Sequence, residues 1–534
     1  MKSSSRGITV PNHRISTLAL RQSLPDIVSA KIEEIIVSEG LQPGTSLPTE
    51  KQLMDQFQVS RTVVREAANA TRWQVARGTQ IDYWITAGAT PADILASYAD
   101  ATGHVPELPH WASGFWQSKL RYRTQAELME VAREFARREL PLSVIVADYF
   151  HWSAMGDYRF DAEEWPDPTA MVGELHDLGV ELMVSIWPTV SPLSENFAEY
   201  RDGGLLVGTD QGVEVHQMIR DKGMQHPLPV GFYDPTNPRT REYVWNLIRR
   251  NYVAHGIGIW WLDASEPELN PAHPANLSLY AGPGGQVANI YPRDNARLFA
   301  EGAAADGLPQ NVLLSRPAWA GSQKYGTAVW SGDIPATWES LAIQVRAGLS
   351  IGIAGIPWWT TDIGGFHGGD PADPGYRELM IRWFQFGVFC PLFRLHGDRE
   401  PRTPTGYLKT GGPNEPWSYG EEAYEMIAAA IHMRERLRPY IHEQMRTASR
   451  TGLPPMRPLF VDFPDDTQAW HVDDQYMFGP HLLIAPIIAP AQTQRLVYLP
   501  TGATWTNVWT GEQLAGGQTV VADAPIERIP IFSI

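Results

Sequence analysis

The chain has almost no cysteine and no long hydrophobic run. Its single cysteine, Cys390, excludes an internal disulfide and suits a reducing compartment. No stretch reaches the ~18 apolar residues that a membrane-spanning helix needs, and residues 1–24 lack the continuous apolar segment of a secretory signal. The sequence therefore predicts a cytoplasmic protein with no membrane partner.

The composition is that of a globular protein with an uneven distribution of charge. A chain of 534 residues should form two to four domains. The net charge is -17, yet residues 1–77 hold ten Lys and Arg against seven Asp and Glu. This basic head could approach phosphates, whereas the acidic body will not attract nucleic acid. The 20 Trp residues suit either sugar faces or a bulky core.

The basic head has the pattern of a helix-turn-helix. Apolar residues at helical spacing predict a helix over residues 27–37 that stops at Gly40. A second helix opens at "LPTE", and the turn 58–60 leads into a third that starts at Arg61. This third helix, capped by Ser60 and with arginines in its first turns, is the second of the two helices that the turn joins, and it could place those arginines in a major groove.

The segment "LQPGTSLPTEKQLMDQFQVSRTVVREA" closely resembles the DNA-reading half of the GntR family of bacterial transcription regulators. The resemblance covers residues 25–68 and implies DNA as a partner, contacted by Ser60, Arg61, Thr62 and Arg65. The family's wing is incomplete, because only "RWQVARGTQ" follows and Gly78 is its one trace. The alternative is a three-helix cap, residues 1–77, that binds no DNA.

From residue 108 onward, short apolar runs alternate with amphipathic helical stretches, which is typical of β/α units around a parallel sheet. The expected strands are residues 113–117, 144–148, 182–187, 258–263, 312–316, 328–333, 351–359 and 393–396. The expected helices are residues 125–139, 169–178, 239–254, 294–305, 338–348 and 375–387. Eight repeats predict an α/β fold, a (β/α)8 TIM barrel over residues 108–450, with its chemistry where the strands end.

Polar and aromatic residues end most of these strands: Trp116, Gln117, Asp148, Trp187, Asp263, Arg316, Asp333, Asp362 and His396. Any one aspartate there could simply cap a helix. Four aspartates, an arginine and a histidine at seven strand ends instead indicate a functional site.

The fragments around these positions are "GFWQSKLRYRTQAEL", "VADYFHW", "WWLDASEPE", "SRPAWAGSQKYG", "VWSGDI", "TTDIGGF" and "RLHG". In this order they closely resemble the motifs of glycoside hydrolase family 31, over roughly residues 79–533. The resemblance implies a retaining exo-α-glycosidase, either α-xylosidase or α-glucosidase, that cleaves α-xylosides or α-glucosides by double displacement. The likeness of two fragments to α-xylosidases favours the former.

By the same resemblance, Asp263 is the nucleophile and Asp333 the general acid/base. The implied sugar-binding residues are Asp148, Trp187, Trp261, Arg316, Trp330, Asp362 and His396. Asp263 must be ionised to attack, which Arg316 would favour, and Asp333 must hold a proton, which the Trp330 wall and the charge of Asp263 would favour. No cofactor and no metal are expected, since the histidines do not recur at i and i+4 and no EF-hand-like run is present.

The flanks depart from the family pattern. Members carry an N-terminal β-sandwich, of which residues 78–107, with a linker helix over 91–102, are a remnant. Residues 421–446 read as helical, and residues 451–534 resemble a truncated proximal C-terminal β-sandwich. An uncovered apolar face of the barrel predicts self-association or poor solubility.

Two other hypotheses stay open at this stage. One is a sugar-responsive transcription regulator of the GntR type, in which an idle barrel binds the effector. Such regulators act as dimers, since one recognition helix makes too few contacts for tight specific binding. The other is a composite chain with neither activity.

Overall fold

The computed structural model describes residues 24–38, 48–59, 78, 84–210, 217–222, 224–267, 274–309, 312–402 and 410–534. The chain forms two compact units, Met1–Asp82 and Tyr83–Ile534. Within the described ranges, no helix is long and apolar enough to cross a membrane.

The N-terminal unit contains α1 (Leu24–Ser38) and α2 (Glu50–Phe57). Thr49 begins α2 with a reciprocal capping box, as the Thr-Glu-Lys-Gln sequence predicts. Buried Val28 and Ile32 of α1 pack with Leu53 of α2. The first two predicted helices are confirmed; the third, with Ser60, Arg61, Thr62 and Arg65, lies outside the described residues.

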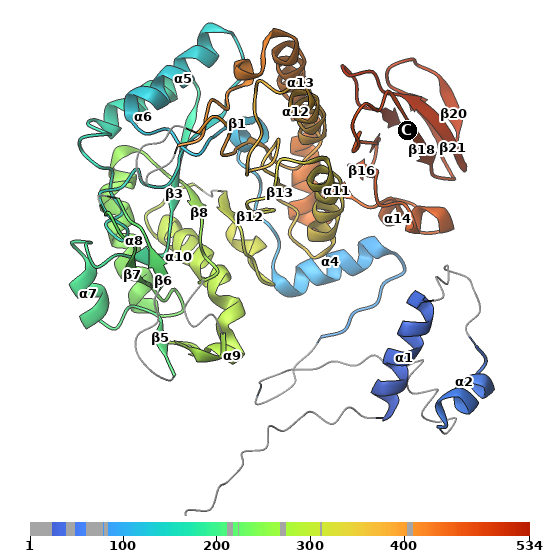
Figure 1. Ribbon diagram of the computed structural model, residues 1–534, viewed down its shortest axis with the longest axis horizontal. Helices are drawn as coiled ribbons and strands as arrows, with labels where there is room; N and C mark the ends of the chain where they lie inside the picture. Colours follow the sequence, from blue (N-terminus) through green and yellow to red (C-terminus); the bar gives the residue numbers. More distant parts are fainter. Residues whose placement is uncertain are drawn as a thin grey trace, which may run out of the picture. The chain divides into compact units, whose positions relative to one another are not determined.

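Eight parallel strands form the barrel of the larger unit (Figure 1). They are β1 (Phe115–Gln117), β2 (Val144–Ala147), β3 (Glu181–Ile186), β8 (Ile259–Leu262), β11 (Leu313–Ser315), β12 (Thr327–Trp330), β13 (Trp359–Thr360) and β14 (Phe393–Leu395). They pair in the order β13-β12-β11-β8-β3-β2-β1-β14. The backbone N–H of Leu392 donates to the Trp359 carbonyl over 3.0 Å, and Ile363 bridges to Leu395. These contacts link the two edge strands and nearly close the barrel.

Helices alternate with the barrel strands. They are α5 (Gln125–Arg137), α6 (Pro168–Asp177), α8 (Pro238–Asn251), α10 (Tyr291–Ala305), α11 (Trp338–Ile353) and α12 (Pro374–Val388). Side-chain caps begin five of them, for example Asp167 at α6, whose Pro168 suits the first helical turn. The strand predicted over residues 351–359 is wrong at its start, because α11 runs to Ile353. Ile351 there packs half-buried against the core and Ile353 is exposed on the helix, and only Trp359 and Thr360 pair as a strand.

Two of the β/α connections carry long insertions. They contain β4 (Thr189–Val190), α7 (Phe197–Asp202), β5 (Gly208–Thr209), β6 (Gln217–Ile219), β7 (Leu228–Phe232), β9 (Leu277–Leu279), β10 (Gly282–Pro283) and α9 (Gly284–Val287). These strands form two small sheets, β4-β7-β6 and β10-β9-β5. Both insertions follow strand ends, on the side where the predicted site lies.

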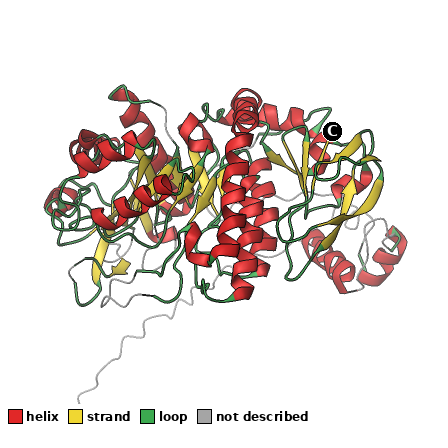
Figure 2. Ribbon diagram, turned by 90° about the horizontal axis from the view of Figure 1, so that it is seen from above, coloured by secondary structure: helices red, strands yellow, loops and turns green. Residues whose placement is uncertain are grey.

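Two helices connect the barrel to the C-terminal sheets. The helices α12 and α13 (Glu421–Thr451) lie between the barrel and these sheets in both views (Figures 1 and 2). Arg434 of α13 is fully buried and donates to the carbonyls of Ser113, Val388, Cys390 and Pro391. A buried guanidinium is tolerated there because backbone oxygens satisfy it.

The C-terminal part folds as antiparallel sheets. One has the order β15 (Met456–Arg457), β16 (Tyr476–Phe478), β17 (Leu482–Ile484), β22 (Ile531–Ser533), β19 (Thr504–Asn507) and β20 (Gln513–Ala515), and β18 (Gln494–Leu499) pairs with β21 (Gln518–Asp523). Arg382 of α12 donates to the carbonyls of Gln492, Ala524, Pro525 and Arg528. Helix α4 (Pro91–Thr102) is where the linker helix is predicted, and α14 (Leu459–Asp462) packs against it.

Candidate active site

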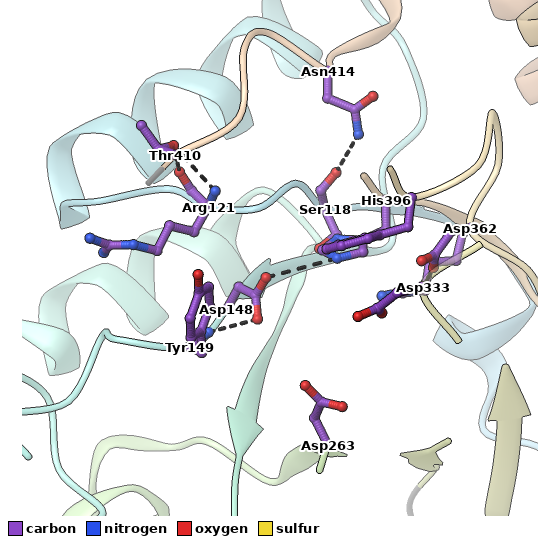
Figure 3. A network of polar contacts seen from close by, with 12 residues as sticks. Ser118, Arg121, Asp148, Tyr149, Asp263, Asp333, Asp362, His396, Thr410 and Asn414 are labelled. Carbon is purple, nitrogen blue, oxygen red and sulfur yellow. Dashed lines mark hydrogen bonds and ion pairs between the residues drawn. The ribbon is translucent and has the colours of Figure 1, made fainter. Parts of the chain in front are cut away.

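Polar side chains meet at the carboxyl ends of the barrel strands (Figure 3). Each follows its strand within three residues, because a side chain there is held by the sheet yet faces the open end of the barrel. Asp148 follows β2, Asp263 follows β8, Arg316 follows β11, Asp333 follows β12, Asp362 follows β13 and His396 follows β14.

Asp263 and Asp333 flank the same guanidinium. Nη1 of Arg316 lies 3.9 Å from Oδ1 of Asp263 and 3.7 Å from Oδ2 of Asp333. Because both distances start at one nitrogen, the two oxygens are no further apart than their sum. That limit admits the separation of about 5 Å between carboxyl groups that retaining glycosidases use. The Asp263 side chain is 14% exposed and that of Asp333 44%, so Asp333 is the more open to solvent.

Burial has the largest effect on the pKa of Asp263. It raises the pKa of this carboxyl to about 7, against the charge of Arg316 and the N–H of Ala264, and the charges of Asp333 and Glu266 raise it further. Arg316 therefore favours ionisation, as the sequence predicts, but it does not offset the loss of solvent. Ala264 donates to Oδ1 over 2.8 Å from a left-handed conformation with φ of 52°, a strained turn of the kind that collects at functional sites.

Asp148 and His396 form a second, deeper group. Oδ2 of Asp148 lies 3.8 Å from Nε2 of His396, whose Nδ1 is 2.8 Å from the Ser118 hydroxyl. Burial, with the charges of Arg394 and Arg399, holds the pKa of His396 well below its usual range, so the ring is neutral. Burial also raises the pKa of Asp148 well above its usual range. A neutral imidazole can both donate and accept a hydrogen bond.

Asp362 pairs with Arg394, and both side chains are fully buried. Burial raises the pKa of Asp362 to about 6 despite the neighbouring guanidinium of Arg394. The same guanidinium lies over the ring of Trp261, 4.6 Å from its centroid. A planar cation against an indole face is held in place by attraction to the ring as well as by its carboxylate.

Aromatic rings line the rest of the site. Trp261 packs edge to face against Trp330 and His396, with centroids 5.4 and 5.0 Å away. On the other side, Trp187 stacks on Tyr149 with 5.4 Å between centroids and 9° between planes. The contacts of these five rings, of Arg316 with the Trp330 ring and of the polar groups above join all nine predicted site residues into one cluster.

Several buried polar atoms of this cluster have no hydrogen-bond partner in the part of the chain that the structure describes. Buried polar groups are normally satisfied, so such atoms point to a ligand. They include both donors and acceptors, which matches hydroxyl groups, since a hydroxyl both donates and accepts. They are Nε1 of Trp187, Trp261 and Trp330, Oδ2 of Asp362, and Nε and Nη2 of Arg394.

Sequence reasoning missed four residues of the cluster: Ser118, Tyr149, Glu266 and Arg394. Arg394 could have been found, because it lies on β14 two positions before His396, which directly follows that strand, and side chains two positions apart point to the same face. Tyr149 directly follows Asp148 and donates its backbone N–H to Oδ1 over 2.6 Å. The pairing of Glu266 with Arg316 had no such local signal, because 50 positions separate them.

No three His, Cys, Asp or Glu side chains are placed to hold a metal ion within the described ranges. The carboxyl groups of the cluster instead lie beside the side chains of Arg316, Arg394 and His396. What the cluster provides is ionisable oxygens, fixed donors and aromatic faces around one space.

Comparisons with known families agree with this geometry. The pattern described as "Glycosyl hydrolases family 31 TIM-barrel domain" matches residues 105–444, and "Glycosyl hydrolase family 31 C-terminal domain" matches residues 452–533. "Bacterial regulatory proteins, gntR family" matches residues 25–71. Both resemblances predicted from the sequence are confirmed.

Individual proteins are also similar. An alpha-xylosidase of Saccharolobus solfataricus is 37% identical over 85% of this chain and 59% of its own length. Alpha-xylosidase A of Aspergillus niger is 35% identical over 87% of this chain and 68% of its own length. The crystal structure of a GH31 alpha-xylosidase from a soil metagenome, complexed with xylose, has a TM-score of 0.80 and 52% identity, covering 84% of this chain and 66% of that one.

The chain spans less than two thirds of the Saccharolobus relative, and the shared part is the barrel with the sheets that follow it. The family pattern of the barrel covers more than half of the chain, in the part where the cluster lies. On this evidence, the chain belongs to glycosyl hydrolase family 31.

Proposed function

We propose that this chain is a retaining α-glycosidase acting on α-xylosides, with Asp263 as nucleophile and Asp333 as general acid/base. The observation that carries the proposal is the single nitrogen of Arg316 within 4 Å of both carboxyl groups. Two carboxyl groups beside one nitrogen, one enclosed and one open to solvent, can reach one anomeric carbon, as double displacement requires.

In the first step Asp263 attacks the anomeric carbon and Asp333 gives its proton to the leaving oxygen, so that a covalent glycosyl-enzyme forms. In the second step Asp333 takes a proton from water, which attacks the same carbon and releases Asp263. The exposed position of Asp333 gives it access to the leaving group and then to water. Two inversions retain the α configuration.

The remaining residues would hold the sugar. Asp148 and Asp362 accept from hydroxyl groups, and His396 and Arg316 donate to them. The rings of Trp187, Trp261 and Trp330 enclose the sugar. Hydroxyl contacts that tighten in the transition state lower the barrier selectively.

The preference for xylosides has the support of the similar proteins, three of which are named as xylosidases. We expect kcat/KM for an aryl α-xyloside to exceed that for the matching α-glucoside by roughly 10-fold or more, the discrimination available from one small substituent in an enclosed pocket. Initial rates on both substrates measure the ratio. A ratio of one or less would contradict the xyloside preference, and a folded protein inactive on both would contradict the glycosidase.

The GntR match supports a second proposal, that residues 25–71 bind DNA. In a sugar-responsive regulator, a sugar bound in the barrel would change the affinity of residues 25–71 for DNA. Binding to a pool of random-sequence duplexes should weaken with salt, since phosphate contacts release counterions, and should be lost in Arg65→Ala. Arg297→Ala, at an exposed ion pair of α10, is the control. Absence of any shift at low salt, with or without xylose, would refute DNA binding.

A further inference from the structure

Arg316 is held along one edge by Glu266. Nε of Arg316 donates to Oε1 of Glu266 over 2.6 Å, and Nη2 donates to Oε2 over 3.1 Å. This two-point pairing occupies one edge of the planar guanidinium and fixes its plane. The nitrogen left over, Nη1, is the one that faces Asp263 and Asp333.

Nη1 is near both carboxyl groups but bonded to neither. Its distances of 3.9 and 3.7 Å exceed the roughly 2.8 Å of a charge-assisted hydrogen bond. It therefore acts on both by charge, and its N–H groups stay available to a hydroxyl of the sugar. A direct bond from Nη1 to Asp263 would instead engage the oxygen that has to attack.

The other contacts of Arg316 do not fix this orientation. Its stem passes Gly332, whose φ of 78° suits glycine and where an added Cβ would lie 3.2 Å from Cδ of Arg316. The ring of Trp330 lies 5.8 Å from the guanidinium carbon, a contact with little directional demand. Among the described residues, Glu266 is thus the side chain that sets the rotation of the guanidinium.

We propose that Glu266 is a positioning residue: it holds Arg316 so that one nitrogen serves both reacting carboxyl groups without bonding to either. The proposal rests on the proposed glycosidase function. Glu266 lies three residues after Asp263 on the loop that follows β8, whereas Arg316 follows β11. The pair therefore also ties together the two neighbouring strand ends that carry the nucleophile and its guanidinium.

Glu266 also contributes charge. Asp263 is faced by Arg316, by the N–H of Ala264, and by the carboxyl groups of Asp333, Glu266 and Asp148. Without the negative charge of Glu266, the guanidinium would stabilise ionised Asp263 more strongly and its pKa would fall below the present value of about 7. Because Asp263 attacks only when ionised, the acid limb of kcat/KM would move to lower pH. A purely structural role would leave that limb in place.

The test compares Glu266→Gln, Glu266→Asp and the control Glu301→Gln, which removes the exposed partner of Arg297 on α10. Kinetics on an aryl α-xyloside are measured from pH 5 to 9, with folding checked by circular dichroism. Glu266→Gln should lower kcat by roughly 10- to 100-fold, as misplaced reacting groups do, and move the acid limb to lower pH. Glu266→Asp keeps the negative charge, but its side chain is one methylene too short to pair with Arg316 in the same way. Its kcat should therefore fall while the acid limb of the pH profile stays in place.

Wild-type kcat and an unmoved acid limb in folded Glu266→Gln would overturn the proposal; if that variant does not fold, wild-type kcat in Glu266→Asp would do so. A second readout separates this proposal from the glycosidase function: the affinity for xylose, followed by tryptophan fluorescence. Wild-type protein that hydrolyses no aryl α-glycoside counts against the function. Xylose affinity about 10-fold weaker in Glu266→Gln than in the wild type, the effect expected from one lost hydrogen-bond donor, would still support the positioning role. Equal affinity in the two proteins would refute it.

Discussion

Asp263→Gly should hydrolyse aryl α-xylosides at least about 10⁴-fold more slowly than the wild type, the size of loss seen when a nucleophile is removed. Glycine leaves no group that can attack the anomeric carbon, while the sugar-binding side chains Asp148, Asp362 and His396 stay in place. Xylose affinity should therefore change little. Initial rates and tryptophan fluorescence measure the two quantities.

Azide identifies the role of Asp263 directly. In Asp263→Gly the small anion can enter the space of the missing carboxyl group and displace an activated leaving group once, which gives the inverted β-glycosyl azide. The exposed Asp473, paired with Arg346, is the control position, and its glycine variant should behave as the wild type. Hydrolysis that persists at the wild-type rate in Asp263→Gly would show that another group is the nucleophile.

Asp333→Ala should show an effect that depends on the leaving group. Disaccharides and alkyl α-xylosides need protonation of the departing oxygen, and their kcat/KM should fall by roughly 10²- to 10⁴-fold, the usual contribution of a general acid. A dinitrophenyl α-xyloside departs without a proton, so its first step should be nearly unaffected. Hydrolysis of the glycosyl-enzyme is then slow, and intact-protein mass spectrometry should detect the intermediate.

Azide should speed this second step in Asp333→Ala and give the α-glycosyl azide, the anomer opposite to that expected from Asp263→Gly. An equal loss of kcat/KM on every leaving group would contradict the acid/base role of Asp333. The pair of products therefore tests the two carboxyl groups separately.

The fold was largely readable from the sequence because barrel strands are buried on both faces and their helices are amphipathic. Val144–Ala147 and Ile259–Leu262 are continuous apolar runs, each directly followed by an aspartate, and both are strands. The seventh strand begins later than the sequence predicts, since the apolar run 351–359 contains the end of α11 as well as the start of β13. Periodicity cannot separate the two in so short a run.

The paired residues of the site were less accessible. Arg394 shares a strand face with His396, so its position was implicit in the alternation of side chains. Glu266 bonds a residue 50 positions away, and no local pattern states which carboxylate will meet which guanidinium. Such pairs depend on how neighbouring strand ends come together.

The sequence by itself determined which chemical groups end the strands and, through ordered motifs, the family. The tertiary structure decided the rest: that one nitrogen of Arg316 reaches both Asp263 and Asp333, that Asp263 is enclosed while Asp333 is open, and that burial outweighs Arg316 in setting the protonation of Asp263. The physical reason is that residue identity is local, whereas distance and exclusion of water exist only once the parallel sheet curls into a barrel.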